Sequence, residues 1–480
     1  MRIRLLVSWA LLGAMACRPQ TSADLPVSAA AEPVSRSEIS PESEPEGAPT
    51  PDEAPEHAAT VLPDTVQASP LVAEIDELAE GLRDDVIRYR RDLHQHPELG
   101  NREHRTAKVI AEHLRRHGWT VREGVAHTGL VAVMQGGRPG PVVALRAEMD
   151  ALPVKEDNEL PFASVATAMW RGEQTPVMHA CGHDLHMAIV MGVAQLLPSL
   201  RDRLPGTVKL LFQPAEEGAP PGEEGGAELM VAQGALSDPS PEVIFGLHAV
   251  PEPVGDVLVR SGPAMASSDR LTIVVRGEQT HGAYPWRGID PVTISAQIVL
   301  GLQTVVSRQL DATVTPSVIS IGSIHGGLRS NIIPDEVEMT GTIRTFDPEV
   351  REQIHQRIHA TAEHIAQAAG AKATVTIETG YPVVDNDPVL LERMRPTLSR
   401  VVGPGHVRPR PMVLGAEDFS FYQQQIPGLF FFLGVVPRGT AVEDAASNHS
   451  PRWFADEGAL DVGVRVMSNL VVDYLFAAAS

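Results

Sequence analysis

The chain of 480 residues has little cysteine, few aromatic residues and a deficit of basic groups, and each shortage narrows its possible functions. Two cysteines, Cys17 and Cys181, cannot build a disulfide-rich scaffold. Aromatic residues make up 4% of the sequence and hydrophobic residues 43%, so the core must consist mainly of aliphatic side chains. The formal net charge of −22 argues against a nucleic-acid partner, because binding to phosphates requires clustered Lys and Arg.

Residues 1–17 have the order of an export signal. Two arginines precede an apolar run at 5–15 that is too short to span a bilayer permanently, and small residues follow it. Cys17 resembles the lipid-attachment cysteine of a bacterial lipoprotein, although Ala14 stands where leucine is usual. Cleavage after Ala16, without lipid, is the alternative. Both hypotheses predict an exported protein of the bacterial cell envelope, either lipid-anchored at the membrane or periplasmic.

A disordered, acidic, Pro-rich tether is predicted over residues 18–70. Its part at 18–69 contains ten acidic residues against two arginines, and large apolar residues are almost absent. Such a segment cannot bury enough surface to offset the entropy of ordering it. Globular structure is expected from residue 71 onward, where apolar residues adopt helical spacing.

Short apolar runs alternate with helical patterns in the segment 71–267. This alternation predicts an α/β fold, with a mostly parallel sheet covered by helices on both faces. Ligands bind outside the carboxyl ends of the strands in such sheets. Three runs are therefore expected to end in chemically active residues. The runs are 141–150, ending in Asp150, 207–217, ending in Glu216 and Glu217, and 242–248, ending in His248.

The pattern changes over residues 268–379. The order there is strand, helix, strand, strand, helix, strand, which is typical of a ferredoxin-like α+β domain. Beyond residue 380 the chain returns to α/β patterns, with a buried strand at 429–436 and a closing helix. We therefore predict a catalytic domain formed by 71–267 and 380–480, into which a lid or dimerisation domain is inserted at 268–379.

Five side chains are candidate metal ligands. Cys181, which has no disulfide partner if Cys17 is lipidated or removed, lies two positions before His183 in a Gly-containing loop, so both can turn toward one point. Five ligands suit two divalent ions about 3.5–4 Å apart that share a water. A single histidine is more often structural than ligating, so the set matters more than any member. The set is Cys181, His183, Glu217, His248 and His449.

Glu216 and Glu217 form a pair of adjacent acids. Neighbouring residues at the end of a strand point in opposite directions, so one can hold a metal while the other faces the attacking water. The alternative is a pair of solvated acids in a turn.

Motifs along the chain from about residue 80 to the C-terminus resemble the amidohydrolase branch of the dinuclear-zinc aminoacylase and carboxypeptidase family. This branch includes N-acyl-L-amino-acid amidohydrolases, hippurate hydrolases and auxin-conjugate hydrolases. The motifs are RRDLHQHPELG (90–100), LRAEMDALPV (145–154), MHACGHD (178–184), QPAEEG (213–218), GLHAVPEP (246–253), HGAYPWRGIDP (281–291), NIIPDEVEMTGTIRTF (331–346), GAEDFSFY (415–422) and NHSP (448–451).

The resemblance assigns roles to individual positions. It implies that the five candidate residues bind the metals and that Glu216 is the general base. It also implies that His281 reaches the active site of a dimer mate and, with a metal, stabilises the oxyanion. Asn331 and Arg344 would hold the substrate carbonyl and carboxylate. One departure is Glu148, where the family usually has aspartate.

The expected activity is hydrolysis of N-acyl amino acids, such as N-acetyl or N-benzoyl derivatives, by a homodimer with two Zn or Mn ions per chain. A dipeptidase or carboxypeptidase acting on short peptides is the alternative within the family. A non-catalytic envelope binding protein is the alternative outside enzymes. Other histidines, among them His94 and His186, are expected to be structural or to support the site from behind.

Overall fold

The computed structural model describes residues 66–479, so the predicted export signal, Cys17 and nearly all of the predicted tether lie outside the described residues. No helix in this described range combines the length and the apolar character that a membrane span requires.

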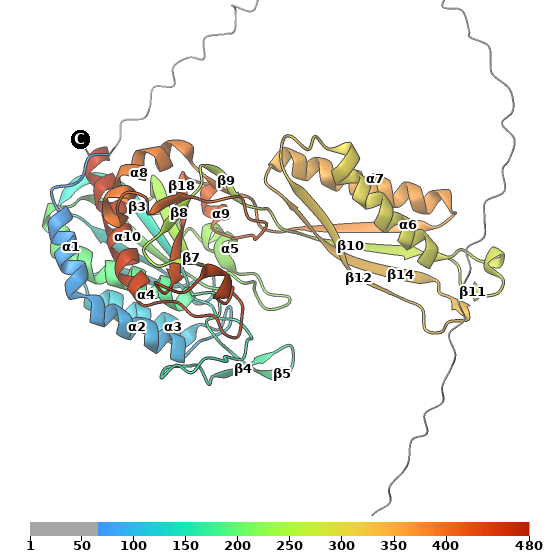
Figure 1. The fold of residues 1–480 in the computed structure, drawn as a ribbon, viewed down its shortest axis with the longest axis horizontal. Helices are drawn as coiled ribbons and strands as arrows, with labels where there is room; N and C mark the ends of the chain where they lie inside the picture. The colour runs from blue at the N-terminus through green and yellow to red at the C-terminus, as the bar shows by residue number, and fades with distance from the viewer. Residues whose placement is uncertain (1–65, 480) are drawn as a thin grey trace, which may run out of the picture. The chain divides into compact units, whose positions relative to one another are not determined.

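A large sheet forms the centre of one part of the fold (Figure 1), and it confirms the predicted α/β class. The sheet has eight strands in the order β1-β2-β6-β3-β7-β18-β8-β17. Its centre is parallel, because β3 pairs in parallel with β6 and β7, and β7 with β18. The strands are β1 (Thr120–Val125), β2 (Gly129–Gln135), β3 (Arg138–Glu148), β6 (Pro205–Gln213), β7 (Val243–Pro253), β8 (Val257–Val259), β17 (Val407–Pro409) and β18 (Gly428–Val436).

Both faces of this sheet are buried, as the near-continuous apolar sequence of its central strands requires. Leu145 and Leu210 face a core shared with one group of helices, while Ala144 and Leu211 face a second core on the opposite side. The larger group is α1 (Val72–Gly81), α2 (Arg83–Gln95), α3 (His104–Arg116), α4 (His183–Leu196), α8 (Pro388–Val402) and α10 (Gly458–Ala478), and α5 (Gly226–Ala232) and α9 (Ser420–Gln423) cover the other face.

All three predicted strand ends differ from the structure. Strand β3 ends at Glu148, two residues before Asp150. Strand β6 ends at Gln213, so Glu216 and Glu217 lie in the following turn. Strand β7 continues past His248 to Pro253, because β18 remains paired with it as far as Val436. Pairing of β7 with β3 stops at Gly246, however. His248 therefore still lies beyond the carboxyl end of the β3 pairing.

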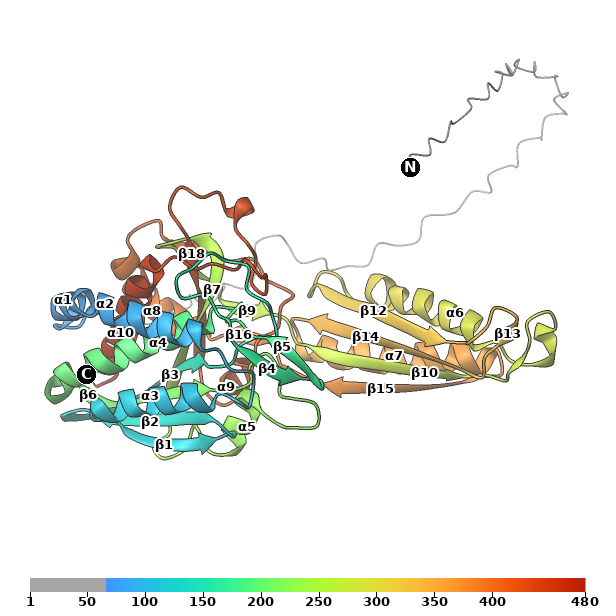
Figure 2. The ribbon, with the colours of Figure 1, turned by 90° about the horizontal axis from the view of Figure 1, so that it is seen from below.

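A second, four-stranded antiparallel sheet is built from residues 269–379 in the order β12-β14-β10-β15. With two helices sharing its core, this is the ferredoxin-like arrangement. Figure 2 shows α6 lying along β12 and β14. The elements are β10 (Asp269–Arg276), α6 (Pro291–Thr304), β12 (Ser317–Gly326), β14 (Glu336–Thr345), α7 (Pro348–Ala368) and β15 (Lys372–Thr379).

Several short strands were not predicted. The hairpin of β1 and β2 extends the large sheet at one edge, and β4 (Thr167–Trp170) pairs with β5 (Glu173–Pro176) just before the Cys181 loop. Strand β1 is largely exposed, and β4 and β5 have four residues each. Segments this short or this exposed carry little hydrophobic periodicity for a sequence to reveal.

Candidate metal centre

Cys181 and His183 are brought together by the start of α4. Gly182 is the N-cap of this helix and has a φ of +98°, a left-handed conformation that favours glycine. A Cβ atom at Gly182 would also lie only 3.0 Å from the Ala249 Cβ. The glycine thus permits a sharp turn that leaves both neighbours, Cys181 and His183, buried.

Three further residues from distant elements converge on Cys181. Its Sγ lies 3.3 Å from His248 Nε2 and 3.2 Å from His449 Nε2. His449 Nε2 in turn lies 3.0 Å from Glu217 Oε1. His449 has a φ of +67° in the loop before α10, where its N–H donates to the Ala180 carbonyl at 2.7 Å. The five predicted ligands therefore form one cluster, in which Cys181 groups with His183 and His248 and also with Glu217 and His449.

The turn after β6 places the two acids differently. Glu217 points to His449, whereas Glu216 Oε2 lies 3.7 Å from His183 Nε2. Asp150 joins this turn to His183, because its Oδ2 accepts from the Glu217 N–H at 2.9 Å and its carbonyl lies 2.8 Å from His183 Nδ1. His183 Nε2 is thereby left facing the cluster.

His186 supports the cluster from behind. Its Nε2 accepts a hydrogen bond from the Ala249 N–H at 2.8 Å, so in a neutral ring Nδ1 carries the proton and donates to Glu148 Oε2 at 3.0 Å. Ala249 directly follows His248. The longer acid at Glu148 still reaches Arg146, with which it forms an ion pair.

The electrostatics of the cluster favour a cation. Burial, together with the charges of Glu217 and Glu216, raises the pKa of the Cys181 thiol well above its usual value. Burial and the carboxylates of Glu417 and Glu217 likewise raise the pKa of Glu216. Burial opposes a charge on His183, but the hydrogen bond to Asp150 and the charge of Glu148 outweigh it and raise the pKa to about 10. Bound divalent ions would offset this concentrated negative charge and stabilise a thiolate.

The donor set also fits metal ions. His183 Nε2 is buried and has no hydrogen-bond partner among the described residues. Unpaired buried polar atoms are costly and call for a ligand. One thiol, three imidazoles and a carboxylate are the types of donor that zinc accepts, and imidazole and carboxylate also suit manganese.

The other predicted site residues do not join this cluster through any hydrogen bond or ion pair within residues 66–479. His281 and Asn331 are neighbours, since the strand Thr280–His281 (β11) pairs with Ile332–Ile333 (β13) and the Gly282 N–H donates to the Asn331 carbonyl at 2.8 Å. His281 is exposed. Arg344 lies on β14 of the second sheet.

The histidines set aside in the sequence have partners of their own. His94 is buried, with Nδ1 2.9 Å from Asp184 Oδ2 and Nε2 3.1 Å from Glu156 Oε1. His355 Nε2 lies 2.7 Å from Asp269 Oδ2.

A buried charge cluster behind the site was not predicted. The Arg146 guanidinium, with no exposed side-chain area, donates to Glu417 and Asp418 at 2.7 Å each in addition to pairing with Glu148. Both acids belong to the GAEDFSFY motif. The motif marks them as part of the family resemblance, but it does not indicate that their partner is Arg146. The carboxylates of Glu417 and Asp418 also contribute to the raised pKa of Glu216.

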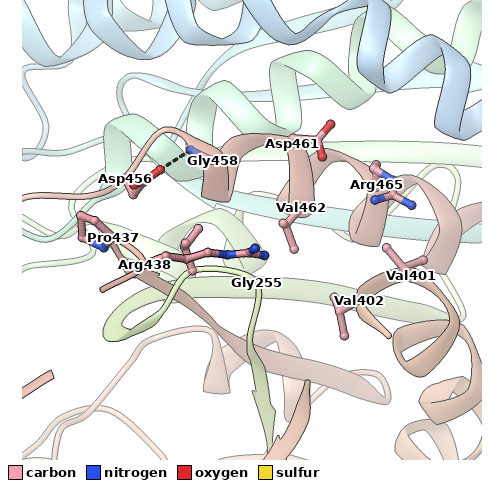
Figure 3. Close-up of a pocket in the computed structure, with 11 residues that line it drawn as sticks. Gly255, Val401, Val402, Pro437, Arg438, Asp456, Gly458, Asp461, Val462 and Arg465 are labelled. Atoms are coloured by element: carbon pink, nitrogen blue, oxygen red, sulfur yellow. Dashed lines mark hydrogen bonds between the residues drawn. The ribbon is translucent and has the colours of Figure 1, made fainter. Parts of the chain in front are cut away.

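A cavity of about 550 Å³ lies apart from the metal-ligand cluster and is lined by other types of residue (Figure 3). It is lined by the start of α10, the end of α8 and residues near Gly255, and Asp456 accepts from the Gly458 N–H at its rim at 2.6 Å. No cysteine or histidine lines it, so it does not share the chemistry of the cluster.

Comparison with known proteins gives concordant results. The sequence profile of Peptidase family M20/M25/M40 matches residues 144–473. Thermostable carboxypeptidase 2 of Saccharolobus solfataricus is 39% identical over 407 residues, covering 84% of this chain and 99% of the relative. N-acetylcysteine deacetylase of Bacillus subtilis is 39% identical over 390 residues, covering 81% of this chain and 96% of the relative. A crystal structure of a dinuclear metal-binding peptidase of the M20 family from Bacillus subtilis has a TM-score of 0.69 and 36% identity, covering 83% of this chain and 99% of that one.

Proposed function

Because the chain belongs to peptidase family M20/M25/M40, and resembles its amidohydrolases, we propose that it hydrolyses N-acyl amino acids to a carboxylate and a free amino acid. The observation that carries the proposal is the convergence of Cys181, His183, Glu217, His248 and His449 beside a buried Glu216. The chain is a metal-dependent amide hydrolase by family; the substrate class and the residue roles are our inference.

Glu216 is proposed to act as the general base. It would take a proton from the attacking water and deliver it to the leaving amine. Burial and the neighbouring carboxylates raise its pKa, which makes the ionised side chain a stronger base than an exposed glutamate. Bound divalent ions would lower the pKa of the water and polarise the scissile carbonyl. The five clustered side chains would hold two such ions, either zinc or manganese.

The remaining roles concern the substrate. His281 is proposed to donate to the developing oxyanion from a partner subunit, while Asn331 and Arg344 bind the substrate carbonyl and carboxylate. The exposure of His281 on the short strand β11 supports a contact outside its own chain. Exchange of subunits provides a direct test and is described in the Discussion.

The proposed activity is tested with purified protein, metal analysis and a substrate panel. We expect about two zinc or manganese ions per chain and release of free amino acid from N-acetyl or N-benzoyl amino acids. Removal of metal by a chelator should abolish hydrolysis, and zinc or manganese should restore it. Fewer than about one ion per chain, with no hydrolysis of any panel member, would instead favour an envelope binding protein.

A carboxypeptidase is the second candidate, because relatives with that name are as similar as the deacetylase. Both reactions cleave an amide next to an amino acid carboxylate, so they differ in the acyl side of the substrate. Dipeptides and N-benzyloxycarbonyl dipeptides in the same panel separate the two activities by their ratios of kcat/KM.

We further propose a homodimer formed through the inserted segment. Strand β12 lies at the edge of the second sheet, and its backbone groups on one side have no strand partner within the described chain. Beside it, α6 exposes Val292 and Leu300, which are 49% and 71% exposed. A two-fold contact would cover both features and place one chain's His281 near the other's site.

The cellular location is proposed from the sequence alone. Export, with Cys17 lipidated or removed, would place the enzyme in the bacterial cell envelope. Labelling of cells with a radioactive fatty acid distinguishes the two forms, since only a lipoprotein incorporates label, and replacement of Cys17 by serine should prevent it.

A further inference from the structure

The turn that carries Glu216 and Glu217 is held by side chains from three other segments. Glu103 Oε1 accepts from the Ala215 N–H at 3.0 Å, the Tyr381 hydroxyl donates to the Glu216 carbonyl at 2.7 Å, and Asp150 Oδ2 accepts from the Glu217 N–H at 2.9 Å. A backbone group of each of the three consecutive residues 215–217 is thus held by its own side-chain hydrogen bond.

This turn needs such support because its backbone is strained. Ala215 has a φ of +52°, a left-handed conformation that costs an alanine about 1 kcal/mol or more. The Tyr381 hydroxyl is the sole donor to the Glu216 carbonyl within the described chain. Burial and the charges of Asp418 and Glu216 raise the Tyr381 pKa well above its usual value, so the hydroxyl keeps its proton.

Tyr381 also lies where the second sheet connects to the rest of the chain. It follows β15 by two residues, and its carbonyl accepts from the N–H of Ser268, which immediately precedes β10. The two connections are therefore joined to each other at Tyr381. A Cβ atom at Gly380 would overlap the Ser268 carbonyl oxygen, so close pairing of the two connections requires glycine there.

We propose that Tyr381 is a positioning residue that couples the paired connections of the inserted segment to the peptide of Glu216. The inference rests on the proposed role of Glu216 as general base. When the connections are paired, the hydroxyl holds the Glu216 carbonyl and orients the base. When they shift, the strained turn loses this support and the base loses its alignment.

The first test replaces Tyr381 by phenylalanine, which removes only the hydroxyl. We expect kcat to fall about 5–10-fold, as for one hydrogen bond, with KM and metal content unchanged. Tyr89→Phe is a matched control, because it removes a hydroxyl that donates at 2.7 Å to Gln195 and has no contact with the turn. A kcat for Tyr381→Phe within twofold of the control value would overturn the proposal.

The second test is a double-mutant cycle with Gly380→Ala, which forces the connections apart. If Tyr381 transmits their arrangement, Gly380→Ala should lower kcat in the wild-type background but much less in the Tyr381→Phe background. Equal losses in both backgrounds would contradict the coupling. Should the Gly380→Ala protein fail to fold, the kcat and KM of Tyr381→Phe decide the matter alone.

Hydrogen exchange separates this inference from the proposed function. In Tyr381→Phe, amides 215–217 should exchange faster than in Tyr89→Phe, whether or not a substrate is known. If the wild type hydrolyses no panel member but this difference is present, the proposed substrate class fails and the positioning role stands. If the wild type is active and neither kcat nor exchange changes, the positioning role fails.

Discussion

At the scale of single residues, the proposed chemistry depends on Glu216, one buried carboxylate among several. Glu216 is 6% exposed, and the negative charges around it belong to Glu217, Glu417, Asp418 and Asp150. A base in such surroundings retains a proton more readily than an exposed glutamate would. The residue next to it, Glu217, instead points to His449.

Glu216→Gln should therefore lower kcat by about 10²–10⁴-fold, because a positioned general base contributes about that much. Metal content, measured by mass spectrometry, should not change, since the five clustered residues remain. Glu224→Gln is the matched control, because Glu224 is an exposed glutamate in the same connection between β6 and α5. Activity of Glu216→Gln within tenfold of the wild type would refute the assignment.

Asp269 gives a prediction about pH. Burial disfavours its charge, but hydrogen bonds from His355 and Arg351 lower its pKa to about 2. Because the folded-state pKa lies below the unfolded value, the stabilisation is present above about pH 4 and is lost as the pH falls through about 2. Asp269→Asn should lower the free energy of unfolding by about 2 kcal/mol at pH 7.

The measurement is urea unfolding of the wild type and of Asp269→Asn between pH 7 and pH 3. The difference in the free energy of unfolding between the two proteins should be constant down to about pH 4 and should become smaller below that pH. Asp335→Asn, at an exposed aspartate, should show no comparable difference. A gap that stays constant to pH 3 would mean that the charge of Asp269 contributes little.

At the scale of elements, the short turn after β6 and the helix α6 both have recognisable sequences, but their conformation or exposure depends on other elements. QPAEEG is a recognisable motif, yet its conformation depends on Glu103, Asp150 and Tyr381 from elsewhere in the chain. The apolar stripe of α6 is visible in the sequence, but its exposed part is known only once α7 and the sheet have covered the rest.

Leu300→Lys should shift the protein toward monomers, because it places a charge on the exposed stripe of α6 that the proposed dimer buries. Light scattering after size exclusion, over a range of concentrations, measures the change. Val389→Lys serves as the control, since Val389 is 59% exposed on α8, outside the second sheet. A dimer of unchanged affinity in Leu300→Lys would exclude this surface.

At the scale of the whole molecule, the proposed active site needs two chains. His281→Ala and Glu216→Ala homodimers should both be nearly inactive. Mixed dimers should regain up to about one quarter of wild-type activity, because half of the dimers in a random mixture are mixed and each then has one complete site. Activity is followed after mixing, and exchange of fluorescently labelled subunits is measured in parallel. Exchange without recovery would mean that His281 does not act on its partner.

The sequence by itself determined the family, the fold class and the identity of the clustered residues. Cys181, His183 and the acid pair lie in short motifs whose residue types are dictated by chemistry, and the central strands are apolar because they are buried on both faces. Local periodicity and local motifs carry that information, so no tertiary contact is needed to recognise it.

Only the tertiary structure decided how these residues are held. The continuation of β7 beyond His248 depends on its pairing with β18. The neutral tautomer assigned to His186 depends on its hydrogen bonds with Ala249 and Glu148. The position of the Glu216 peptide depends on the hydroxyl of Tyr381. Each of these partners is far away in the sequence. Such contacts arise when distant segments pack against each other and must satisfy one another's buried polar groups, and neither composition nor spacing along a single segment specifies which groups will meet.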